Sequence, residues 1–166
     1  MAPQYPLQQL LQIKRTRVEE AERVLADRRK ALELEEENLR KAEEARQRVK
    51  THYQETLHAL REGMDTASMP PAKITHTKDY LIEVREKLKQ EDKKVKDQER
   101  VVEAAQKQVD EAIKVLRQRR LEVEKLELHE GDWRKGVSLE ELRLEGIEID
   151  DLGTAMFNTR KDRRDG

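Results

Sequence analysis

The sequence predicts an all-α protein, a long two-helix antiparallel coiled-coil hairpin with a flexible C-terminal tail. Charged residues make up 43% of the chain and aromatic residues only 3%, which is too few large apolar side chains for an ordinary globular core. Glycine and proline are absent from residues 7–62 and 77–129. Within both tracts apolar residues recur at a seven-residue spacing, the pattern of helices that pack along one narrow seam.

The first tract predicts a helix over about residues 7–62, and the second predicts one over about 77–129. Both are rich in good helix formers, and each helix would extend roughly 80 Å. The first seam has one failure, at Arg46, and consists of Leu11, Val18, Leu25, Leu32, Leu39, Tyr53 and Leu60. The second seam has no failure and consists of Leu81, Leu88, Val95, Val102, Val109, Leu116 and Val123.

Residues 63–77 are expected to form the turn between the helices, because Gly63, Pro70 and Pro71 disfavour helix continuation there. If the chain folds back, seam positions whose numbers add to 141 face each other. At the companion positions this register places large polar residues near small ones, such as Gln98 near Ala42. We therefore expect the two helices of one chain to pair with each other, and we expect this pairing to be modest in strength. A parallel homodimer or isolated helices with solvated charged faces are the alternatives.

The character of the sequence changes after Leu128, where residues 129–136 are expected to interrupt the second helix. Ser138 and Glu141 then have the spacing of a capping box that would open a short helix. The predicted organisation is an N-terminal lead at 1–6, the hairpin at 7–130 and a partly disordered tail at 131–166.

No residue pattern in the chain predicts catalysis, a cofactor or a metal site. The chain has no cysteine, its four histidines lack zinc-ligand spacing, and no phosphate-binding loop is present. The 35 basic and 36 acidic residues nearly balance, which gives no reason to expect nucleic acid as a partner. No apolar run approaches the roughly 20 residues of a membrane span. We expect a non-enzymatic, cytoplasmic protein.

The few aromatic residues are the candidates for partner contact. Tyr53 and Tyr80 are expected near the turn on opposite helices, together with His52 and Leu57. The alternative is that Tyr53 is only a seam residue and Tyr80 only flanks the seam. Trp133 would either seal the end of the hairpin or anchor a partner.

A basic cluster supplies the remaining candidates. Arg117, Arg119 and Arg120 would either bind an acidic rim on a partner or form a solvated face.

Short motifs along the chain carry a family resemblance. They are Tyr5-Pro6-Leu7, Ile13-Lys14, Arg17-Val18, Ala21-Glu22, Lys50 with His52-Tyr53, Tyr80, Leu116-Arg117 with Arg119-Arg120, Leu128-His129 and Trp133. Over about residues 5–135 the chain resembles the type III secretion stalk proteins of the YscO/FliJ-like family, most closely the chlamydial version. Residues beyond Gly136 depart from that resemblance.

The resemblance implies a coiled coil that looks like the rotor stalk of rotary ATPases. Such a protein would lie at the cytoplasmic base of a secretion apparatus and link the hexameric secretion ATPase to the cytoplasmic domain of the export gate. Some members of the family bind secretion chaperones, so chaperones are a further expected partner. An escort module that binds chaperones without acting on the ATPase, or a structural coiled-coil adaptor, is the alternative. We expect the isolated chain to be a monomer.

Overall fold

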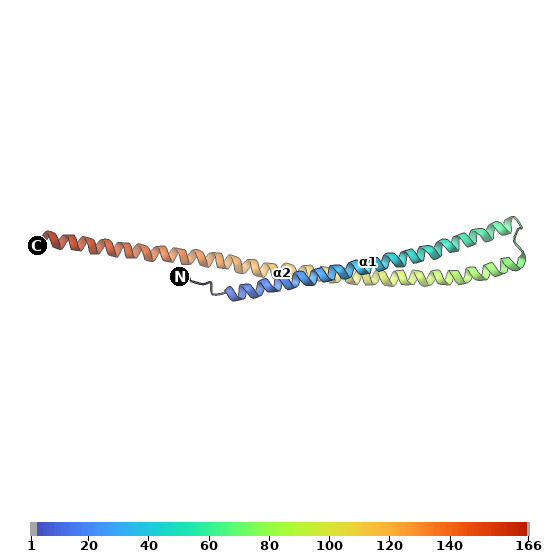
Figure 1. Cartoon of the computed structure of the whole chain (residues 1–166), viewed down its shortest axis with the longest axis horizontal. Helices are drawn as coiled ribbons and strands as arrows, with labels where there is room; N and C mark the ends of the chain where they lie inside the picture. Colours follow the sequence, from blue (N-terminus) through green and yellow to red (C-terminus); the bar gives the residue numbers. More distant parts are fainter. Residues whose placement is uncertain (1–2, 166) are drawn as a thin grey trace. The chain divides into compact units, whose positions relative to one another are not determined.

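The computed structural model describes residues 3–165, which form two helices joined by one turn (Figure 1). Helix α1 spans Gln8–Asp65 and helix α2 spans Pro71–Asp165. No strand occurs within residues 3–165. The helices pack against each other, and the predicted all-α hairpin is confirmed.

The turn comprises residues 66–70 and lies within the predicted 63–77. At the end of α1 the amide of Ser68 donates to the carbonyl of Gly63 at 3.1 Å, and the amide of Ala67 donates to Met64 at 3.3 Å. These two bonds form a Schellman motif, and Ala67 takes the left-handed conformation it needs, with φ of 50°. At the start of α2 the carbonyl of Pro70 accepts from the amides of Lys73 and Ile74. Pro71 thus occupies the first helical position, where a missing amide hydrogen costs nothing.

Within the segment Glu22–Val115, the buried side chains follow the predicted seams. Val95 is the most buried, with 1% of its surface exposed. The others are Leu25, Leu60, Leu81, Val84, Val109 and Ala112. These residues supply the apolar contact that holds the two helices together here, because isolated helices gain little stability from propensity alone.

The pairing of the companion positions in this segment differs from the expectation. The side-chain amide of Gln98 donates to the Glu35 carbonyl at 3.0 Å and to its Oε2 at 2.6 Å. Gln98 therefore contacts Glu35, whereas the expected register placed it near Ala42. The two polar residues satisfy each other across the seam, so a charged side chain is accommodated without an unpaired polar group.

A second group of contacts joins residues 3–21 to α2 from Leu116 onward. Leu11 is fully buried, and Tyr5 and Leu116 are nearly so. Ion pairs flank this core at Lys14 to Glu122, 2.8 Å, and at Arg15 to Glu127, 2.9 Å.

Helix α2 continues without a break through the stretch where an interruption was predicted. Gly131, Gly136 and Ser138 all lie inside the helix, so the expected break at 129–136 and the separate short helix opened by Ser138 are wrong. Glycine inside a helix lowers its stability by about 1 kcal/mol relative to alanine, which a helix can tolerate. Proline would break the helix, and the sequence has none after Pro71. The division into lead, hairpin and tail, and the flexibility of that tail, stay predictions.

Candidate partner-binding sites

The first candidate site consists of His52, Tyr53, Leu57 and Tyr80, and we call it the turn-side patch. His52 Nε2 and the Tyr80 hydroxyl lie 2.8 Å apart and share a hydrogen bond between α1 and α2. Their rings meet edge to face, with centroids 5.8 Å apart. Both side chains are exposed, and Tyr80 keeps 42% of its surface open to solvent.

The other two members of the turn-side patch lie deeper. Tyr53 and Leu57 are half-buried at the seam, so they share their surface between the helix contact and solvent. The sequence placed these residues in one region, and the hydrogen bond between His52 and Tyr80 adds a fixed geometry. An exposed aromatic ring held by a hydrogen bond is already ordered, which reduces the entropy lost when a partner binds.

The second candidate residue, Trp133, packs on Tyr5. Their ring centroids are 5.6 Å apart, and the Tyr5 hydroxyl is 2.6 Å from His129 Nδ1. We call Tyr5, His129 and Trp133 the aromatic clasp. Burial, followed by the nearby Glu130 carboxylate, raises the pKa of the Tyr5 hydroxyl, which therefore stays protonated and able to hydrogen-bond. This contact accounts for a sealing role of Trp133, while its use as a partner anchor stays a prediction.

The arginine cluster lies on α2 near the same part of the chain. Arg117 and Arg120 are exposed, and Arg119 is half-buried. The Arg119 guanidinium lies 3.6 Å from Glu122, the carboxylate that also binds Lys14. These contacts hold the pKa of Glu122 below its usual range, with the Lys14 hydrogen bond the largest cause. Arg117 and Arg120 present charge outward, which fits the predicted acidic partner but does not identify one.

Sequence reasoning missed Tyr5 and His129 as members of a site. Tyr5 lies before α1, in the predicted lead, and His129 lies in the stretch expected to break the helix. Extending the antiparallel pairing from Leu11 toward the N-terminus brings Tyr5 to the level of the residues around Trp133. The heptad register could therefore have predicted this contact from the sequence.

The described residues do not resemble a catalytic centre. Across the part of the chain whose side chains are described, no polar or charged residue is buried, and no group of three or more His, Asp or Glu could hold a metal ion. Within residues 3–165, neither helix has a stretch long and apolar enough to cross a membrane.

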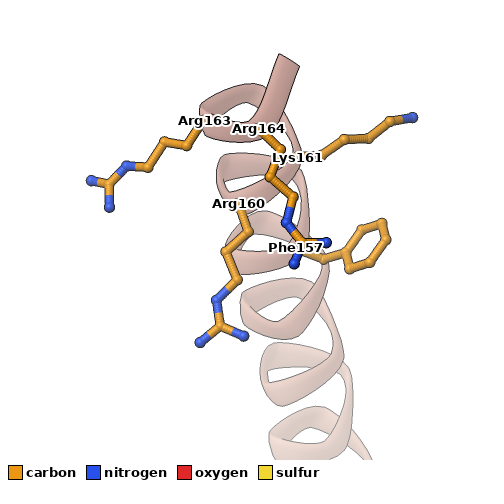
Figure 2. A pocket seen from close by; sticks show the side chains of 5 residues that line it. All are labelled: Phe157, Arg160, Lys161, Arg163 and Arg164. Carbon is orange, nitrogen blue, oxygen red and sulfur yellow. The ribbon is translucent and has the colours of Figure 1, made fainter. Parts of the chain in front are cut away.

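Two open hollows lie near the end of α2. One, of about 490 Å³, lies among Phe157, Arg160, Lys161, Arg163 and Arg164. Figure 2 shows these side chains reaching outward from a single helix. A hollow of this kind lacks the converging groups that catalysis needs.

Two long helices packed on each other define the class of protein, a helical hairpin of coiled-coil type. The comparisons give the family. A model of YscO-like proteins matches residues 2–163, so the chain belongs to the YscO-like family, whose members are associated with type III secretion. This is not a known enzyme family.

A solved structure is also similar to this chain. It is described as that of a YscO homolog, CT670, from Chlamydia trachomatis, and it is 38% identical with a TM-score of 0.90. The match covers 97% of this chain and 99% of that one. The comparison with curated proteins found no match. The family resemblance read from the short motifs is thereby confirmed, and it extends beyond Gly136.

Proposed function

We propose that this protein is a non-enzymatic coupling stalk of a type III secretion apparatus, located in the cytoplasm at the base of the machine. It links the hexameric secretion ATPase to the cytoplasmic domain of the export gate and offers a surface to secretion chaperones. The observation that carries the proposal is the match to the YscO-like family over residues 2–163 in a chain that folds as a two-helix hairpin.

The distribution of contacts supports a role in binding rather than catalysis. The seam residues are buried or half-buried between α1 and α2. In contrast, His52, Tyr80, Arg117 and Arg120 lie on the surface. Tyrosine and arginine are the residue types that most often dominate binding energy at interfaces. The turn-side patch is the proposed contact for the gate or a chaperone, and the arginine cluster is the proposed contact for the ATPase.

The ATPase contact is tested by adding the purified protein to the purified secretion ATPase from the same organism. A coupling stalk changes hexamer formation or the rate of hydrolysis, because it binds the assembled ring in preference to the free subunit. The test variant is Arg117→Glu with Arg120→Glu, which changes the proposed contact and should reduce the effect. An escort module that ignores the ATPase would leave both hexamer formation and hydrolysis unchanged.

The turn-side patch is tested separately with Tyr53→Ala and Tyr80→Ala together. Binding to the cytoplasmic domain of the gate should weaken by about tenfold or more, as expected for loss of aromatic anchors. Because Tyr53 is half-buried, a second variant with His52→Ala and Tyr80→Ala changes only exposed side chains and keeps the seam intact. Ile82→Ala, at an exposed residue of the same helix, is the control. Unchanged binding in both patch variants, with helicity retained, removes this contact from the proposal.

A further inference from the structure

The last part of α2, residues 138–164, exposes every side chain. Some of its apolar residues follow a heptad spacing, because Leu142, Ile149 and Met156 are seven residues apart, while other exposed apolar residues such as Leu144 and Phe157 lie on other faces. Leu152 lies three residues after Ile149, and it and the three heptad residues are all more than 60% exposed. At 3.6 residues per turn they lie along one face of the helix, and we call them the tail stripe.

The tail stripe is not a continuation of the seam that α2 shares with α1. The seam can be followed through the half-buried Trp133 and Val137. Leu142 comes five residues after Val137, which rotates its side chain by roughly 140° around the helix axis. The tail stripe therefore faces a different direction from the hairpin seam and needs a different surface to cover it.

An uncovered helix over these residues would have marginal stability. Gly146 and Gly153 lie within it, and each costs about 1 kcal/mol relative to alanine. Helices in water gain most of their stability from packing of an apolar face. A row of exposed leucine, isoleucine and methionine along a continuous helix is therefore a candidate surface for binding a partner.

The charges of this segment are divided between its two halves. Residues 138–151 hold six acidic residues and one basic residue, whereas residues 152–164 hold four basic residues and one acidic residue. An open hollow of about 290 Å³ lies along the tail stripe. Its lining includes the apolar residues Leu152 and Met156 and the basic residues Arg160 and Arg163. Figure 2 shows the basic side chains at this end of α2. The surface is acidic at one end, apolar in the middle and basic at the other end.

We propose that the tail stripe binds the same segment of a second copy of this chain in antiparallel orientation. A two-fold axis near residues 150 and 151 would bring Ile149 opposite Leu152 of the second copy. Ile149 and Leu152 then pair reciprocally at the centre and the acidic half faces the basic half, as a two-fold interface requires, while Leu142 lies opposite Thr159. This proposal goes beyond the coupling function and revises the monomer expected for the isolated chain.

Charge fixes the orientation of the pair. In the antiparallel arrangement Glu141 lies opposite Arg160 of the second copy, and Glu145 lies about one helical turn from the same arginine. Arg163 lies about one turn from Glu141, and the reverse contacts are made as well. A parallel pair would place Glu145 against Glu145 and Arg163 against Arg163, which is unfavourable at close range. The observed charge division therefore favours one of the two orientations.

The full chain is tested by sedimentation across a dilution series. We expect twice the 19.6 kDa mass of one chain at high concentration, and a monomer on dilution. Ile149→Lys with Leu152→Lys should raise the dissociation constant by about 100-fold or more, because each change buries a charge at the centre of the interface. Leu144→Lys is the matched control, since Leu144 is an exposed leucine on another face of the same segment. A wild-type chain that stays monomeric at every concentration overturns the proposal.

A charge exchange tests the orientation. Glu141→Arg with Glu145→Arg should weaken the dimer, as should Arg160→Glu with Arg163→Glu, because each pair of changes creates like-charge contacts. All four changes together restore opposite charges and should restore the dimer. A four-residue variant as weak as either two-residue variant contradicts antiparallel pairing.

Cross-linking gives an independent measurement of orientation, because the natural chain contains no cysteine. A mixture of Leu142→Cys chains with Thr159→Cys chains should form a mixed disulfide on mild oxidation, while either variant alone should not. Preferential cross-linking of Leu142→Cys to itself indicates a parallel pair and overturns the proposal.

Discussion

Tyr5 is the residue that closes the N-terminal end of the pairing, although it lies outside α1. Its side chain is 3% exposed, and it combines a ring contact to Trp133 with a hydrogen bond to His129. Aromatic pairs of this kind add about 0.5–1.5 kcal/mol beyond the area they bury. Tyr5 therefore adds to the contacts that Leu11, Lys14 and Arg15 make when the first turns of α1 pack on α2.

Replacing Tyr5 tests this at the residue scale. Tyr5→Ala should cost about 2 kcal/mol or more of local stability, because it removes a buried ring and its partner contacts. Trp133 is the only tryptophan in the chain, so its fluorescence should shift to longer wavelength as the ring becomes exposed. Amide exchange should rise in the first turns of α1. Tyr80→Ala is the control, and an emission spectrum in Tyr5→Ala like that of the control would refute the aromatic clasp.

The pairing of Lys14 with Glu122 should depend on pH. Because the hydrogen bond from Lys14 lowers the pKa of Glu122, the stabilisation is fully present above the ordinary value of about 4.3 and is lost as pH falls through the lower, folded value. A double-mutant cycle with Lys14→Met and Glu122→Gln measures the coupling. The coupling should be constant from pH 7 to about 5 and should fall below about pH 4. A coupling of the same size at pH 3 would show that the ion pair does not contribute.

At the scale of elements, the turn sets how α1 and α2 are paired. The Schellman motif at Gly63 to Ser68 and the proline at the start of α2 leave a connection of only five residues, 66–70. A Cβ added at Gly63 would lie 2.8 Å from Met69 Cε and 3.1 Å from Met69 Cβ, so the Met69 side chain would have to shift to accommodate it. Ala67 stands where glycine is usual, in a left-handed conformation that strains a side chain.

Replacing Ala67 by glycine should therefore stabilise the protein. The relief of left-handed strain exceeds the added freedom of the unfolded chain, and we expect a gain of about 0.5–1 kcal/mol in the free energy of unfolding. Urea unfolding followed by circular dichroism measures the change. Ala59→Gly, at an exposed position inside α1, should instead lose about 1 kcal/mol. Loss of stability in both variants would mean that Ala67 carries no strain.

The two helices and the turn region could be predicted because heptad spacing and prolines are local features of the sequence. The pairing of Gln98 with Glu35 could not, since the exact register depends on the backbone path through residues 66–70, where an alanine takes a glycine-like conformation. The continuation of α2 past Gly131 and Gly136 was missed because glycine lowers helix stability by an amount that the contact of Trp133 with Tyr5 can offset. The turn-side patch was located correctly as a region, while its role in binding stays a prediction.

At the scale of the whole molecule, the seams account for the fold and the surface residues account for the proposed function. The described side chains bury no charge, so the hairpin is held by apolar contact and by polar pairs at its edges. The chain belongs to the YscO-like family, which is associated with type III secretion.

The most direct test of the coupling function is a pull-down of the full-length protein from its native cytoplasm, with the recovered proteins quantified by mass spectrometry. We predict recovery of the secretion ATPase together with the export gate, with the gate reduced in the His52→Ala, Tyr80→Ala variant and the ATPase retained. Recovery of neither the ATPase nor the gate would contradict the proposed coupling function.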